Sequence, residues 1–133
     1  MSAARTPEQQ KFIVGYLTAA LWSSTDTNPE TEETFHLDDF EWGAGMEDKL
    51  AEDCIDFMVY QAQNLARYAV QYRPAGVYDV WECAGHDFWL TRAGHGVGYW
   101  DRGLGQLGDD LTTATKTFGG IDLYLGDDRL VWS

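Results

Sequence analysis

Apolar residues recur at helical spacing in the first part of the chain. Thr6 is a suitable N-cap, Pro7 suits the first helical position, and Gln9 stands where a capping box places its return hydrogen bond. We therefore predict a helix from about Pro7 to Trp22. Its apolar face comprises Phe12, Ile13, Tyr16, Leu17, Ala20 and Leu21.

A second amphipathic pattern predicts a helix from near Met46 to about Tyr72. The intervening segment, Ser23 to Gly45, is long, polar and acidic, and Asn28-Pro29 marks a turn within it. A connection of this length is too long to be idle in a compact domain. The apolar face of the second helix holds Met46, Leu50, Cys54, Phe57, Met58, Leu65, Tyr68 and Ala69, whereas Asp48, Glu52, Asp53 and Asp56 lie opposite.

Beyond the second helix the pattern favours β structure. Residues Val77–Cys83 are β-prone and predict a strand. Within His86–Arg102, the pair Gly94-His95 suits a two-residue hairpin turn. Pairing Arg92 with Val97 then places Trp89 opposite Trp100 and Asp87 opposite Arg102, a favourable aromatic pair and an opposite-charge pair.

The C-terminal region predicts a short helix and a second hairpin. Asp109 or Asp110 can cap a helix over roughly Leu111–Phe118, which Gly119-Gly120 would end. Strands over Ile121–Leu125 and Arg129–Trp132 follow, with Leu123, Leu125, Leu130 and Trp132 assigned to the core face. The predicted fold class is α+β: two N-terminal helices, a β-hairpin, a short helix and a C-terminal β-hairpin, forming a small antiparallel sheet.

Composition agrees with one domain over residues 1–133. The chain is 44% hydrophobic and 14% aromatic, which is enough apolar material for a single core. No apolar run approaches the roughly 20 residues of a membrane span, and the N-terminus lacks a secretory pattern. We expect a bacterial cytosolic location in which Cys54 and Cys83 are free thiols.

Charge changes this picture because it is uneven. The net charge is −13, and residues 25–56 hold twelve acidic residues and one lysine, Lys49, which accounts for −11. This segment is expected to be partly flexible. Over Asp48–Asp56, about 12 Å of helix, four carboxylates lie about 4 Å apart along the axis, close to the roughly 3.4 Å phosphate repeat of one DNA strand. An acidic helix face can imitate such a row, although amphipathic helices commonly carry acids outside for solubility.

Candidate chemical sites are weaker. His86 and His95 would lie some 20 Å apart along a hairpin, so they would not share a metal ion, and we expect neither a metal nor a cofactor. His36 is a third isolated histidine. Cys54 falls on a core face, which favours packing over nucleophilic chemistry. The aromatic residues Trp81, Trp89, Tyr99 and Trp100 either fill a core or stack a small ligand.

The stretch AGHDFWLTRAGHGVGYWDRGLG, residues 84–105, and the later FGGIDLYLGDD resemble a group of small proteins encoded by bacteriophages. Members carry a close version of this motif, followed by a short helix and a terminal hairpin. The resemblance covers the last third of the chain strongly and FIVGYLTAALWSS loosely. It implies a phage origin and expression in the bacterial cytosol, and because the group has no established activity, it assigns no catalytic role to any residue.

These observations lead to an acidic inhibitor as the first functional hypothesis. The negative field opposes direct binding of nucleic acid or an anionic membrane and favours a basic partner, such as the nucleic-acid-binding groove of a host defence protein. The protein would then be a DNA mimic of the anti-CRISPR or anti-restriction type. Its partner-binding residues would be Glu32, Glu33, Asp38, Asp39, Glu41, Asp48, Glu52, Asp53 and Asp56.

Two alternatives stay open. A small enzyme or ligand-binding module would use the His86–Arg102 hairpin, through His86, Asp87, Trp89, Trp100 and Asp101. A virion or assembly component would instead form a homodimer or larger homo-oligomer through exposed aromatic side chains. Ligand-dependent stabilisation and concentration-dependent sedimentation distinguish these two from the inhibitor.

Overall fold

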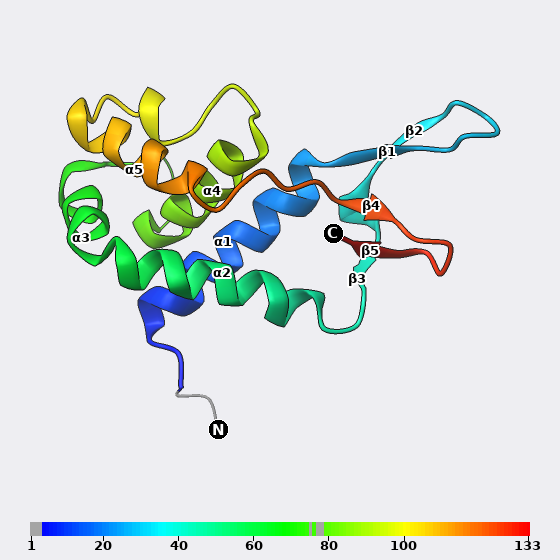
Figure 1. Ribbon diagram of the computed structural model, residues 1–133, viewed down its shortest axis with the longest axis horizontal. Helices are drawn as coiled ribbons and strands as arrows, with labels where there is room; N and C mark the ends of the chain where they lie inside the picture. The colour runs from blue at the N-terminus through cyan, green and yellow to red at the C-terminus, as the bar shows by residue number, and fades with distance from the viewer. Residues whose placement is uncertain (1–3, 75, 77–78) are drawn as a thin grey trace.

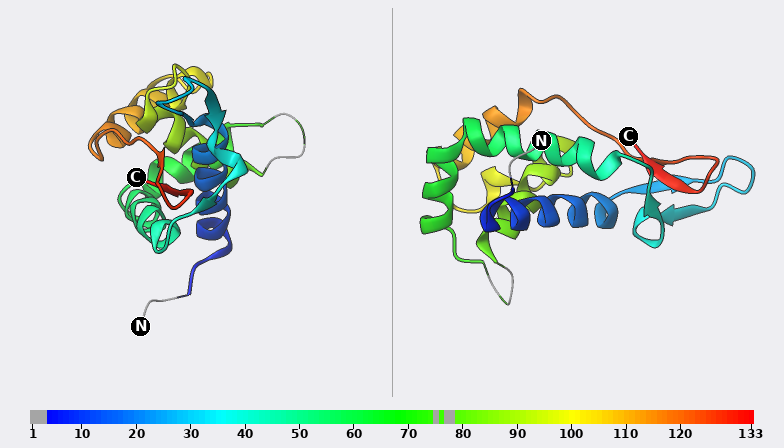
Figure 2. Two further views of the ribbon diagram at one scale, coloured as in Figure 1. Left: turned by 90° about the vertical axis from the view of Figure 1, so that its right-hand side faces the viewer. Right: turned by 90° about the horizontal axis from the view of Figure 1, so that it is seen from below.

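The computed structural model describes residues 4–74, 76 and 79–133. Its helices gather at one end of an elongated molecule, and two small sheets lie at the other end (Figures 1 and 2). The helices are α1 (Pro7–Ser23), α2 (Met46–Tyr60), α3 (Ala62–Gln71), α4 (Val80–Ala93) and α5 (Gln106–Lys116), with the 3-10 turns η1 (Leu37–Asp39) and η2 (Tyr99–Asp101).

The predicted first helix is confirmed as α1, including its start. The Thr6 hydroxyl accepts from the backbone N–H of Gln9 at 3.1 Å, and the Gln9 side chain accepts from the Thr6 N–H at 3.0 Å. This capping box satisfies two N–H groups that a helix otherwise leaves unpaired. The apolar face predicted for this helix is the buried one, with Phe12, Tyr16 and Ala20 fully buried.

The second predicted helix is wrong in its continuity. The chain forms α2 and then α3, and Gln61 between them leaves the helical conformation with φ −108° and ψ 25°. A break here turns α3 away from α2 (Figure 1). Residues Leu65 and Tyr68 of α3 still reach the core, so the apolar pattern was correct although the straight axis was not.

The predicted hairpin over His86–Arg102 does not form, and this is the main correction to the fold class. Residues 80–93 make helix α4, and Gly94 ends it at φ +74° as a left-handed C-cap. The predicted strand over Val77–Cys83 is wrong as well, because α4 begins at Val80; Val77 and Tyr78 lie outside the described residues. The Trp89–Trp100 strand pair is absent with the hairpin, since Trp89 is buried and Trp100 is 41% exposed.

Helix α4 is pressed against α1 along most of its length, which explains why this segment is helical. A Cβ at Gly85 would overlap the carbonyl oxygen of Phe12, and one at Gly15 would overlap that of Glu82. These two glycines let the backbones approach closely. The crossing brings Phe88 against the core aromatics, with its ring stacked on that of Phe57 at 4.2 Å between centroids.

The sheets differ from the prediction in order and direction. Strands β1 (Thr25–Thr27) and β2 (Thr34–His36) form an antiparallel pair, while β3 (Glu41–Trp42), β5 (Leu130–Trp132) and β4 (Tyr124–Leu125) form a second sheet in that order. The terminal hairpin is present as β4 and β5. Because β3 runs parallel to β5, the sheet is mixed rather than antiparallel.

The core face predicted for the terminal hairpin is only partly right: Leu123 is buried as predicted. Leu125 pairs with Val131, and Val131 is fully buried, whereas Leu130 and Trp132 are half-buried. The preceding short helix is longer at its N-terminus than predicted, since α5 begins at Gln106. The acidic segment, residues 25–56, therefore runs from the end of α1 through β1, β2, η1 and β3 into α2, and its strand β3 pairs with β5.

Candidate functional site

The nine acidic residues predicted to bind a partner lie in two regions. One group follows α1, in the turn after β1, in η1 and in β3; the other lies on α2, which leads away from the sheets (Figure 1). Eight of the nine are exposed, and Asp53 is half-buried. The first group comprises Glu32, Glu33, Asp38, Asp39 and Glu41; the second comprises Asp48, Glu52, Asp53 and Asp56.

Helix α2 presents a row of acids to solvent. Asp48, Glu52 and Asp56 are spaced four residues apart and all three are exposed. Asp48, whose side chain is 91% exposed, lies 3.8 Å from the Arg5 guanidinium, a surface pair of small energetic weight. The row is therefore outward-facing and nearly free of bound cations within the described residues.

Asp53 is less exposed than the other three predicted acids of α2, and it is paired with a cation of the chain. Its Oδ2 accepts from Nη1 of Arg92 at 2.7 Å, and the Arg92 side chain is only 8% exposed. The same guanidinium donates to the Tyr16 hydroxyl and to the carbonyl oxygens of Phe118 and Gly119. Arg92 thus connects Asp53 of α2 to α4, and the same guanidinium contacts α1 and the residues after α5.

One member of the first acidic group, Glu33, lines an open cavity of about 820 Å³ between the β1–β2 and β4–β5 hairpins, together with Asp26, Glu30 and Asp127. Glu30 and Glu33 stand at its edge with Phe35 and Phe40, and the Arg129 guanidinium lies 5.4 Å from the centre of the Phe40 ring. Arg129 has a left-handed backbone, φ +62°. Arg129 therefore places a cation beside this cavity, and Arg5 places one beside Asp48 at the start of the α2 row.

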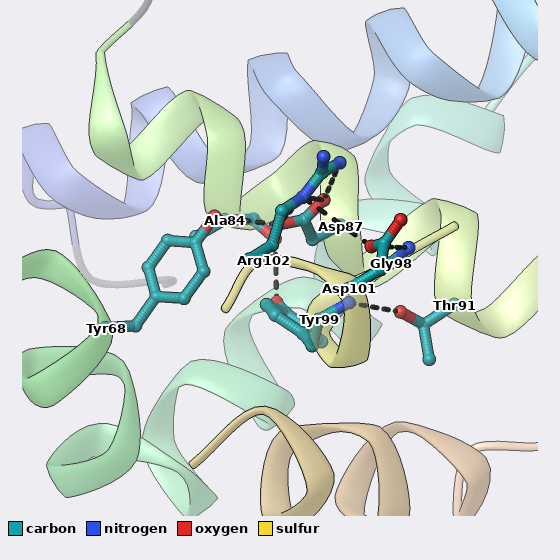
Figure 3. A network of polar contacts seen from close by, with 8 residues as sticks. All are labelled: Tyr68, Ala84, Asp87, Thr91, Gly98, Tyr99, Asp101 and Arg102. Atoms are coloured by element: carbon teal, nitrogen blue, oxygen red, sulfur yellow. Dashed lines mark hydrogen bonds and ion pairs between the residues drawn. The ribbon is translucent and has the colours of Figure 1, made fainter. Parts of the chain in front are cut away.

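Several residues of the stretch 84–105 lie in the interior of the fold. Asp87 of α4 is 1% exposed, and its carboxylate accepts from Arg102 Nη2 at 2.7 Å and from Arg102 Nε at 3.1 Å. The Tyr68 hydroxyl donates to the other oxygen at 2.8 Å. Figure 3 shows α3, α4 and the chain after η2 meeting at this carboxylate. The predicted Asp87–Arg102 contact is present, but it joins a helix to a loop rather than two strands.

The loop after α4 is held by further motif residues. The Tyr99 hydroxyl donates to the Ala84 carbonyl at 2.7 Å, and the Tyr99 N–H donates to the Thr91 hydroxyl at 3.2 Å (Figure 3). Asp101 accepts from the Gly98 N–H at 3.0 Å. These contacts give the Thr91, Tyr99 and Asp101 side chains partners inside the fold.

Burial perturbs the titrating groups in this region. It raises the pKa of the Tyr68 hydroxyl, an effect that the neighbouring Asp87 carboxylate strengthens. It also lowers the pKa of the His86 imidazole below the usual 6.5 and raises the pKa of the Cys83 thiol. A thiol shifted in this direction carries little thiolate near neutral pH, which makes Cys83 a poor nucleophile.

The three histidines lie on different elements of the fold. His36 in β2 and His95 after α4 are exposed, and His86 is half-buried on α4. Among residues 4–74, 76 and 79–133 there is no group of three His, Cys, Asp or Glu side chains placed to hold a metal ion. The alternative of a ligand-binding module assumed a hairpin over His86–Arg102. These residues form the end of α4 and the loop after it, so the predicted arrangement of the module is absent.

Two interactions of this region were not predicted from the sequence: the hydrogen bond from Tyr68 to Asp87 and the ion pair between Asp53 and Arg92. Neither has a local sequence signal, because the partners are 19 and 39 residues apart.

A search of protein-family models, curated proteins and solved structures found nothing that matches the chain. In the part of the chain that the structure describes, no helix is both long enough and apolar enough to cross a membrane.

Proposed function

We propose that this protein acts by binding a positively charged protein through the exposed acids of residues 25–56, as a phage-encoded inhibitor of a nucleic-acid-binding host defence protein. The observation that carries the proposal is the concentration of −11 of the net charge in this segment, with eight of the nine candidate acids exposed. A complementary basic groove would be drawn to such a field and held in register by it.

The acid row on α2 is the part of this surface best suited to a nucleic-acid site. Asp48, Glu52 and Asp56 repeat every four residues, which is about 6 Å along the helix. Their spacing is wider than the 4 Å considered for four carboxylates, because Asp53 is paired with Arg92. A nucleic-acid-binding groove carries cations that match the roughly 3.4 Å spacing of successive phosphates. The acids of the row would therefore contact every second phosphate-binding position in such a groove.

A lysate capture experiment tests the proposal. The tagged protein is incubated with bacterial lysate at about 50 mM and about 500 mM NaCl, where screening of exposed charges differs strongly. We expect nucleic-acid-binding proteins to be retained at the lower salt concentration and released at the higher one. The Glu52→Lys/Asp56→Lys variant should lose this capture while keeping its circular dichroism spectrum, because both side chains are exposed.

The matched control is Asp110→Lys/Asp122→Lys. Both residues are exposed and lie outside the acidic segment, so this variant has the same net charge as the test variant. It should keep the captured proteins. The proposal fails if wild type retains no nucleic-acid-binding protein at low salt, or if both variants lose capture equally, since net charge alone would then explain retention.

A further inference from the structure

An apolar groove of about 400 Å³ lies where α2 meets α3, beside the start of α1. Met58 and Val59 of α2 form one wall, and Ala62 and Leu65 of α3 continue it. Leu65 is only 1% exposed, so it lies at the floor, whereas Val59 is 63% exposed at the rim. Trp81 of α4 closes the far side.

The polar groups at the groove's edge are already satisfied. Thr6 and Gln9 line it from α1, and their side chains are hydrogen-bonded to each other's backbone N–H groups in the capping box. A polar ligand would have to compete with these bonds. An apolar side chain would need no such exchange, and its burial would remove apolar surface on both sides from water.

The groove is continuous with the acid row of α2. Val59 follows Asp56 by three residues and Asp48 by eleven, and eleven residues of α-helix bring a side chain back to within about 20° of its starting direction. Tyr60, 79% exposed, adjoins the same end. From Asp48 to Val59 the helix rises about 16 Å, or three turns.

We propose that this groove receives one large apolar side chain from a basic amphipathic helix whose cations face Asp48, Glu52 and Asp56. The inference rests on the proposed function and specifies its partner: a helix of about three turns, with cations on one stripe and an apolar anchor at one end of that stripe. The acids steer and orient this helix, and the anchor supplies desolvated contact area, as anchors do in other interfaces.

Charge complementarity favours this occupant over a second copy of the chain. Two copies docking through this face would bring two acid rows together, and like charges across an interface oppose association. An apolar segment without cations would gain nothing from the acids beside the groove. The same helix must therefore carry both features.

The test uses two synthetic helical peptides of about 16 residues, long enough to span the face. Both peptides carry three lysines spaced four residues apart. In one peptide a leucine stands three residues before the first lysine and another three residues after the last. The second peptide has serine at these two positions. Fluorescence anisotropy with the full-length protein gives both affinities. We expect the leucine peptide to bind about tenfold more tightly, because one leucine side chain is partly buried in the groove.

Val59→Ser should remove most of this tenfold preference and leave the serine peptide's affinity unchanged. Val70→Ser is the matched control, because Val70 is 68% exposed on α3 and does not line the groove. Equal affinities of the two peptides for wild type overturn the groove inference. So does a dimer in sedimentation that Val59→Ser dissociates, since the groove would then hold a second copy.

The acidic surface is tested separately in the same assay. Glu52→Lys/Asp56→Lys and about 300 mM NaCl should each weaken both peptides. If they do so while leucine and serine peptides bind equally, the groove inference fails and the proposed function stands. If neither change affects either peptide, the failure lies with the acidic surface, and the proposed function fails with it.

Discussion

Replacing Arg102 with methionine would leave the Asp87 carboxylate buried without its cation. Asp87 is 1% exposed, and two nitrogens of Arg102 donate to it, the shorter bond being 2.7 Å. Only the Tyr68 hydroxyl, at 2.8 Å, would remain of the side-chain donors described here. Removing one partner of a buried ion pair costs about 3–5 kcal/mol, so we expect Arg102→Met to lower the free energy of unfolding by that amount.

The opposite substitution, Asp87→Asn, should cost less. The Arg102 side chain is 27% exposed and can be hydrated when it loses its counter-charge, and asparagine keeps an acceptor for Tyr68. We expect about 1–3 kcal/mol for this variant. Urea unfolding followed by circular dichroism, with linear extrapolation to water, measures both. The reasoning is refuted if Arg102→Met costs less than about 1 kcal/mol or if Asp87→Asn is the more destabilising of the two.

Two further predictions concern α4. Gly85→Ala should destabilise the protein by about 1–3 kcal/mol in thermal or urea unfolding, because its Cβ would overlap the Phe12 carbonyl; Gly120→Ala, where a Cβ meets nothing within 4 Å, should be neutral or slightly stabilising. His86 has a folded-state pKa below its unfolded 6.5, so the unfolded state binds more protons as pH falls through that value. The stability advantage of wild type over His86→Gln should therefore shrink between about pH 7.5 and pH 5 in paired urea titrations, whereas a constant difference would contradict the shift.

Local signals predicted the first helix well. The Thr6–Gln9 capping box and the apolar period of residues 12–21 act within one turn or one face, so the sequence contains nearly everything that decides α1. The same reasoning placed Cys54 in the core, and it is fully buried. The break at Gln61 escaped it because both halves keep their apolar positions.

The segment of α4 shows where local reasoning fails. Its Gly94-His95 pair and its aromatic residues favour a hairpin, yet the close crossing with α1, permitted by Gly15 and Gly85, selects a helix. A usable signal existed: Asp79 caps α4 by accepting from the Trp81 N–H at 2.8 Å, and Gly94 stands at the position of a C-terminal stop. Weighing these start and stop signals above β propensity would have given the helix.

The sequence predicted the negative charge of the candidate surface, but it predicted only some of the residues that form it correctly. Charge counting located the acidic segment, and the helical period put Asp48, Glu52 and Asp56 outside, where they are. The same period put Asp53 with them, because nothing near it in sequence announces Arg92, which lies 39 residues later. An ion pair between residues far apart in the sequence forms only when packing brings their elements together, and a single sequence does not show that packing.

The parallel pairing of β3 with β5 also has a consequence for biosynthesis. Glu41 aligns with Leu130, and the Asp26 carboxylate accepts from the Leu125 N–H across 99 residues of sequence. On the ribosome, the strand-forming acidic segment emerges long before either partner has been translated. The β3–β5–β4 sheet can close only after residues 124–132 have been translated, so it should form later than the first helices, and contacts of such wide sequence separation slow that step.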